Sequence, residues 1–324
     1  MRWFLMVFCV TIWAGCGPAG KAPTEEEVAG EALDAEAERA LKEFAEYEKT
    51  ADVSNPTKLI EYIRKVEEVR NKLEKTIYVG KVEEFDRKKA RLMDKLAELS
   101  YEPMEKATQS ARVCILRGDY AGALGELKRF PPELEKTPAF EQISLYKEVL
   151  ENMESLPEEV KEALKQVVDF VAKSEFRKAY ERVARSIDIV RDRYHSIDEE
   201  ESDAEKAKEK KKVWGWGSAM VVIMGAAVLD KHMSDMAESG EFDKMVEVCS
   251  ELHNTTGIKD KLGSFINAWA VTAMNRKVER LIAAGQFEAA LQFLQGMKGN
   301  ESFSGIMGNI ERWEAQVREK SGGR

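Results

Sequence analysis

Few side chains in this protein are placed to do chemistry. Its 324 residues include four cysteines and three histidines, which are His195, His232 and His253. No histidine lies in an HExxH pattern or has a cysteine at metal-ligand spacing, and neither a GxSxG nor a CxxC motif occurs. The 59 acidic residues are too numerous for the spacing of any pair to indicate an acid and a base. We therefore expect no enzymatic activity, no cofactor and no metal site.

Cys16 follows a segment that is typical of an export signal. Residues 1–15 carry one positive charge, at Arg2, and then an apolar run too short to span a membrane comfortably. The run ends in Trp13-Ala14-Gly15-Cys16, which resembles a bacterial lipobox. That resemblance implies cleavage after residue 15 and a diacylglycerol on the thiol of Cys16. The alternative is an ordinary signal peptide or anchor in which Cys16 has no special role.

The segment after Cys16 and the net charge favour a location in the bacterial cell envelope. Residues 16–30 contain several glycines and prolines, as a tether between a lipid and a folded body would. In lipoproteins of this kind an aspartate after the cysteine favours the inner membrane. Gly17 at that position therefore weakly favours the periplasmic side of the outer membrane. The net charge of −9 argues against nucleic acid as a partner.

Two amphipathic helices are predicted within the N-terminal region, residues 31–100. Asn55-Pro56 marks a helix start, after which apolar residues recur every three or four positions as far as Ile77. Gly80 interrupts the pattern, and a second apolar stripe runs from Val82 to Leu99. Two long helices joined at one glycine predict an antiparallel helical hairpin.

A short motif recurs four times after residue 100. Each copy has a small residue, a polar residue, an aromatic residue, two free positions and two apolar residues. The small residue is expected to end one helix in a left-handed conformation, and the polar residue to start the next helix. The aromatic residue is expected to belong to the core of the turn and to face the preceding helix. These four aromatic residues are Tyr120, Phe176, Phe242 and Phe287.

The motif resembles the turn and second helix of the tetratricopeptide repeat. Regions 101–194 and 213–324 hold two copies each, and successive copies begin 56, 66 and 45 residues apart, whereas that family repeats at 34. We therefore expect an all-α fold of antiparallel helical hairpins, stacked as an irregular solenoid like that of tetratricopeptide repeats. The alternative is an irregular helical bundle whose turns have converged on one sequence.

Two unusual segments lie between the repeat regions. The connector 195–212 is dominated by acids and then lysines, as in a solvated helix or flexible link, although an anionic lipid or cell-wall polymer could dock there. Residues 213–229 carry no charge and just reach the length of a membrane span. If Cys16 is exported, a span here would place the lysines outside, against the positive-inside tendency. We therefore expect a buried helix, with a membrane segment as the alternative.

These features together predict a lipid-anchored envelope protein whose helical-repeat surface binds other envelope proteins or peptides. It would contact the membrane through lipidated Cys16, and no nucleic acid is expected as a partner. The alternative is a cell-wall-associated accessory module that binds glycan or peptide stems, with an unrecognised enzyme as the least favoured class. Cys114 and Cys249 fall in different motif units and are expected to be free thiols.

Substitution of the cysteine tests the lipid anchor. Cys16→Ser is expected to leave the precursor uncleaved and without incorporated palmitate, because the thiol that accepts the diacylglycerol is gone. Metabolic labelling of the variant beside the unchanged protein measures this. Equal labelling of the two would refute the lipidation of Cys16.

Overall fold

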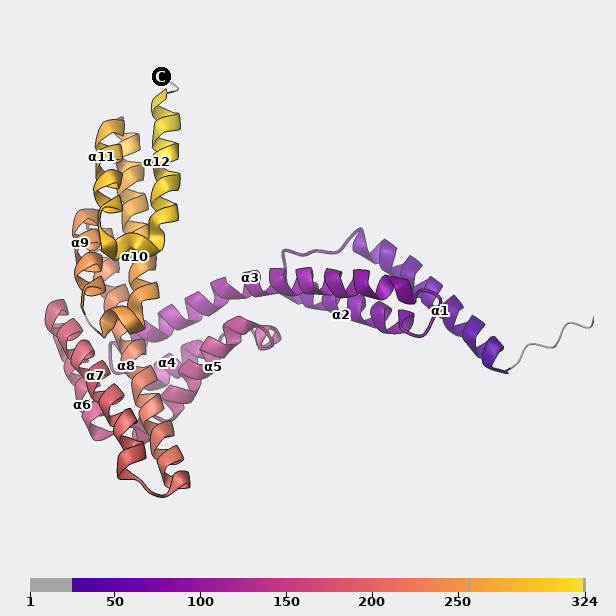
Figure 1. Ribbon diagram of the computed structural model, residues 1–324, viewed down its shortest axis with the longest axis horizontal. Coiled ribbons are helices and arrows are strands. Elements are labelled where there is room, and N and C mark those ends of the chain that lie inside the picture. The colour runs from indigo at the N-terminus through magenta and orange to yellow at the C-terminus, as the bar shows by residue number, and fades with distance from the viewer. Residues whose placement is uncertain (1–24, 256, 323–324) are drawn as a thin grey trace, which may run out of the picture. The chain divides into compact units, whose positions relative to one another are not determined.

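The computed structural model describes residues 25–255 and 257–322, and its regular structure there is entirely helical. Twelve α-helices and four short 3-10 helices make up this part of the chain (Figure 1). The all-α class expected from the sequence is confirmed. The chain forms two compact units, one reaching Leu96 and the other beginning at Ala97. Cys16 and the rest of residues 1–24 lie outside the described residues.

The N-terminal unit contains α1 (Glu25–Glu48), α2 (Pro56–Leu73), η1 (Val79–Lys81) and the first part of α3 (Val82–Ile115). Helices α1 and α2 run antiparallel, because Tyr62 of α2 donates a hydrogen bond to Glu48 at 2.6 Å. At the other end of the pair, Lys72 lies 2.9 Å from Glu36. The ring of Phe44 contacts the rings of Tyr62 and Phe85, which joins the three helices.

The apolar stripe predicted for α2 is largely confirmed. Its buried members are Leu59, Ile63, Val66, Val69 and Leu73. Ile77 continues the sequence pattern, but its side chain is 75% exposed. The reason is that α2 ends at Leu73, so Ile77 lies in the turn before η1 and not on the helix face.

Helix α3 is longer than the sequence pattern suggested. It begins at Val82, as predicted, and continues past Leu99 to Ile115 with Pro103 in its interior. A proline removes one backbone hydrogen bond from a helix and usually kinks or ends it. The apolar face of α3 continues beyond the proline with Ala107, Ala111 and Ile115, and the burial of this face offsets the local cost.

The C-terminal unit is organised around four helix pairs. In three of the four pairs the second helix is the shorter one. The pairs are α3 with α4 (Tyr120–Leu127), α6 (Glu158–Ala172) with α7 (Phe176–Glu200), α8 (Ala204–Glu238) with α9 (Phe242–His253), and α10 (Ile258–Ala283) with α11 (Phe287–Lys298). The remaining elements are η2 (Pro132–Leu134), α5 (Pro138–Glu151), η3 (Met153–Ser155), η4 (Glu301–Ile306) and α12 (Met307–Gly322).

The turns within the four pairs share one geometry. The small residues Gly118, Ser174, Gly240 and Gly285 have φ values of 73°, 57°, 70° and 72°, so all four are left-handed as predicted. The amide after each small residue donates to the carbonyl five positions earlier, at 2.8–3.0 Å. This pair of features is the Schellman motif, which satisfies carbonyl groups at a helix end. The recurring sequence motif thus encodes a recurring helix stop.

The aromatic residue of each motif begins the second helix and is half-buried. This holds for Tyr120, Phe176, Phe242 and Phe287. The fully buried position comes three residues later and is occupied by Ala123, Ala179, Met245 and Ala290. The ring therefore covers the side of the turn, while the next turn of the helix supplies the interior contact.

Helix α8 is the core helix of the C-terminal unit. It packs against α5, α6, α7, α9 and α10, and nine of the ten residues 220–229 are buried. The fit is close at Gly225, where a Cβ atom would lie 2.7 Å from Leu262 and 3.0 Å from Val183. By length and composition α8 is also the one described helix that could cross a membrane, and 56% of its most apolar window is buried in the protein.

The charged segment 195–212 forms the end of a helical hairpin. Helix α7 continues to Glu200 and α8 begins at Ala204, with Asp203 accepting hydrogen bonds as its N-cap. Lys211 pairs with Asp198 at 2.5 Å, across the two helices. Lys210 likewise pairs with Glu201 at 2.8 Å, so two lysines of α8 face acids at the end of α7.

The left-handed turns give a pair of opposite predictions. Gly240→Ala should lower the free energy of unfolding by about 1–2 kcal/mol, because alanine disfavours a positive φ, whereas Ser174→Gly should raise it by up to about 1 kcal/mol. Gly296→Ala is the control, because Gly296 lies inside α11 with open space around it, and it should stabilise the protein by about 0.5–1 kcal/mol. Equilibrium urea unfolding measures all three. Equal effects of alanine at positions 240 and 296 would contradict the left-handed turn.

Candidate functional site

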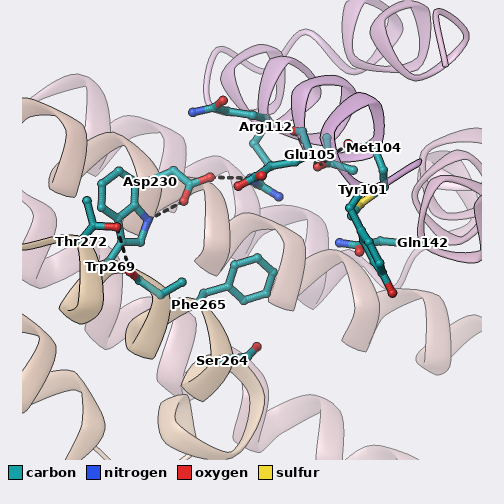
Figure 2. A pocket seen from close by; sticks show the side chains of 13 residues that line it. Tyr101, Met104, Glu105, Arg112, Gln142, Asp230, Ser264, Phe265, Trp269 and Thr272 are labelled. Atoms are coloured by element: carbon teal, nitrogen blue, oxygen red, sulfur yellow. Dashed lines mark hydrogen bonds and ion pairs between the residues drawn. The ribbon is translucent and has the colours of Figure 1, made fainter. Parts of the chain in front are cut away.

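A cavity of about 470 Å³ opens between α3, α5, α8 and α10 of the C-terminal unit (Figure 2). Aromatic, amide and hydroxyl side chains predominate in its lining. The lining residues are Tyr101, Met104, Glu105, Thr108, Gln109 and Arg112 of α3, Gln142 of α5, Asp230 of α8, and Ser264, Phe265, Ala268, Trp269 and Thr272 of α10. The volume is within the range of small-ligand and side-chain pockets.

A buried ion pair forms one wall of this cavity. The guanidinium of Arg112 donates from Nε to Asp230 Oδ2 at 2.6 Å, and the two side chains are 8% and 14% exposed. Figure 2 shows the Asp230 carboxylate between Arg112 and Trp269, and the indole of Trp269 donates to Asp230 Oδ1 at 2.8 Å. Arg112 also donates from Nη1 to the hydroxyl of Tyr146 at 3.2 Å. These four side chains come from α3, α8, α10 and α5.

The surroundings keep Arg112 charged. Burial by itself lowers the pKa of the guanidinium, but the neighbouring Tyr146 and Asp230 more than offset this, so the pKa of Arg112 is raised. The ring of Phe265 lies 5.6 Å from the guanidinium carbon, close enough for a cation–π contact. A buried charge is tolerated only when it is paired and hydrogen-bonded. Both charges meet that condition, because Arg112 also donates to Tyr146 and Asp230 also accepts from Trp269.

The sequence places these residues on the inner faces of their helices. Asp230 is the first charge after the uncharged run 213–229, one turn beyond the buried Ala226 and Ala227 of α8. Arg112 follows the buried Ala111 on α3 and comes six residues before the Gly118 turn. A charge that continues a buried helix face needs a partner of opposite sign. The position of Asp230 and Arg112 next to buried residues was the one signal in the sequence that could have located the pair.

A second cavity, of about 610 Å³, lies on the other side of the pair between α3, α6 and α8. Gln109, Arg112 and Asp230 line both cavities. The second lining is apolar at Val113, Leu116, Val168, Val171 and Ala227, and charged at Arg117, Lys231, Asp235 and Glu238. Arg112 and Asp230 therefore form a shared partition between two adjoining cavities.

The histidines and cysteines do not line either cavity. The ring of His232 stacks on Phe176, one of the motif aromatics, with centroids 4.2 Å apart, and its Nδ1 lies 3.2 Å from the hydroxyl of Tyr180. Burial lowers the pKa of His232. Cys114 and Cys249 are free thiols, and burial raises the pKa of Cys249 to about 12, which makes it a poor nucleophile. No group of three metal-binding side chains occurs within the described residues.

Comparison with known proteins finds no matching family model, no matching curated protein and no matching solved structure. What the cavities can do therefore follows from their own chemistry. The charges of Arg112 and Asp230 neutralise each other, while amide and hydroxyl groups beside aromatic rings offer hydrogen bonds and apolar contact. That combination suits the binding of a chain with both polar and apolar groups.

Removal of one hydroxyl tests the network around Arg112. Tyr146→Phe should lower the free energy of unfolding by about 1.5–3 kcal/mol, because it deletes a hydrogen bond to a buried charge. Tyr101→Phe is the matched control, because Tyr101 lines the cavity beside Arg112 but is exposed and has no part in the network, and it should change stability by less than about 0.5 kcal/mol. Urea unfolding of both variants measures the difference. A Tyr146→Phe variant as stable as the control would contradict the network.

Proposed function

We propose that this protein is a lipid-anchored protein of the bacterial cell envelope that binds other proteins or peptides through the two adjoining cavities. The observation that carries the proposal is the origin of the lining residues. Gln142 comes from α5, and Leu116, Arg117 and Ser174 lie in turns, but every other lining residue comes from α3, α6, α8 or α10. These are the first helices of the four pairs, and we refer to the two adjoining cavities that they line as the groove.

The first helices of the pairs line the cavities and the second helices do not, which supports the finer interpretation of the fold as a tetratricopeptide-like solenoid. The second helices α4, α7, α9 and α11 contribute no lining residue to either cavity. Their buried positions, such as Leu127, Val183, Cys249 and Leu294, serve internal packing. An array of this kind leaves one layer of helices free to meet an extended partner.

A peptide is the partner that the lining suits best. Tyr101, Phe265 and Trp269 offer apolar and aromatic contact in the first cavity, and Gln109 and Gln142 offer hydrogen bonds to a peptide backbone. The second cavity continues with aliphatic residues bounded by charges of both signs. Catalysis is not proposed, because the two buried charges are committed to each other and to Tyr146 and Trp269.

Cross-linking from the groove tests this function in living cells. A photo-activated amino acid at Ser264, which lines the first cavity, should give adducts with one or a few polypeptides, whereas the same group at exposed Lys259 of α10 should not. Ala268→Trp should abolish the Ser264 adducts, because the indole would occupy the cavity that Ala268 lines. Lys259→Trp is the matched control and should leave them unchanged.

The pattern of adducts decides the proposal. Identical adducts from Ser264 and Lys259, or Ser264 adducts that persist in the Ala268→Trp variant, would contradict binding in the groove. Adducts with glycan in place of polypeptide would favour the cell-wall-binding alternative.

A further inference from the structure

Three large apolar side chains are exposed together at one end of the N-terminal unit. Ile77 is 75% exposed, Val79 55% and Leu33 46%. Ile77 and Val79 lie in the turn between α2 and α3, and Leu33 lies on α1 beside the residue that holds this turn. We refer to Leu33, Ile77 and Val79 as the apolar tip. Single exposed apolar residues are ordinary, whereas several near one another can form a contact surface.

The apolar tip is fixed in place by α1. Asp34 accepts a hydrogen bond from the backbone amide of Ile77 at 3.0 Å. The turn also carries an internal bond from Val79 N to Thr76 O at 3.1 Å. The tip is therefore an ordered part of the unit, and its exposed side chains are held outward.

The tip lies at the end of the unit where the chain leads back to Cys16. Helix α1 begins at Glu25, nine residues before Asp34, which corresponds to about 14 Å of helix. A further nine residues separate Cys16 from Glu25 and can reach at most about 30 Å. A lipid on Cys16 would therefore hold this end of the unit within reach of the bilayer surface. The opposite end of the unit, with the α1–α2 connection at residues 49–55, is separated from the tip by the length of α2.

From this geometry we infer that the apolar tip inserts into the surface of the bilayer that holds the lipid anchor, as a second membrane contact. The inference rests on the proposed lipidation of Cys16. The two acyl chains of a diacylglycerol already give stable anchoring, and the apolar contact of the tip would add to it. The second contact would also fix the orientation of α1 and α2 at the surface, which a flexible tether alone cannot do.

The contact is apolar and not electrostatic. Lys75 and Lys81 bracket the turn, but Glu74, Glu83 and Glu31 are exposed around the same end of the unit. These charges give no net attraction to an anionic surface. Insertion should therefore persist at high salt, unlike the binding of a basic patch.

An environment-sensitive probe on the tip tests the contact. The full mature chain, with the probe NBD on Ile77→Cys and with Cys114→Ser to remove the other accessible thiol, is reconstituted into vesicles of phosphatidylcholine and phosphatidylglycerol. The control carries the probe on Val53→Cys, because Val53 is also exposed but lies at the opposite end of the α1–α2 pair. A quencher attached to the lipids should quench the probe at position 77 several-fold more than at position 53, at low and high salt alike. Iodide in the water should show the reverse order.

The acylation state of Cys16 is read from the intact mass of the same samples. An acylated Cys16 with equal lipid quenching at positions 77 and 53 would overturn the membrane contact and leave the anchor standing. Shielding of position 77 from iodide without lipid quenching would point to a protein on the tip and would also overturn it. A mature chain without acyl groups would refute the anchor itself, and with it this inference.

Discussion

Arg112 and Asp230 are charges that α3 and α8 bury together, and burial of either one requires that it be paired with the other. Each would be costly to bury alone, because a desolvated charge without a partner costs several kcal/mol. Their hydrogen bonds to each other, to Tyr146 and to Trp269 join four helices at one point. Both cavities meet at this point, so the same contact that holds the helices together also shapes the surface they expose.

Local features of this fold were predictable from sequence, and long-range ones were not. The turns at Gly118, Ser174, Gly240 and Gly285 depend on a few consecutive residues, so their left-handed geometry could be anticipated. The prediction that Ile77 belongs to the buried stripe of α2 was wrong, because the apolar pattern continues four residues beyond the end of this helix. The Arg112–Asp230 pair joins positions 118 residues apart, and 50 basic residues were candidates for the partner of Asp230. Only the packing of α3 against α8 selects Arg112.

The two units support different parts of the proposed role. The N-terminal unit carries the apolar tip at the end from which the chain leads to Cys16, which suits attachment to a membrane. The C-terminal unit carries the groove, which suits the capture of a peptide or protein segment. Helix α3 contributes to both units, with Phe85 in the core of the first and Arg112 in the partition of the second. A continuous helix thus connects the proposed membrane contact with the proposed binding surface.

A double-mutant cycle on the partition tests the central claim most directly. The free energy of unfolding is measured in urea for Arg112→Met, for Asp230→Leu and for the double variant. The buried pair predicts that each single variant loses about 3–5 kcal/mol, because it leaves an unpaired charge. The double variant should lose clearly less than the sum, with the unpaired groups of Tyr146 and Trp269 accounting for what remains. Single losses below about 1 kcal/mol, or strictly additive losses, would contradict the claim that the two charges are buried as a coupled pair.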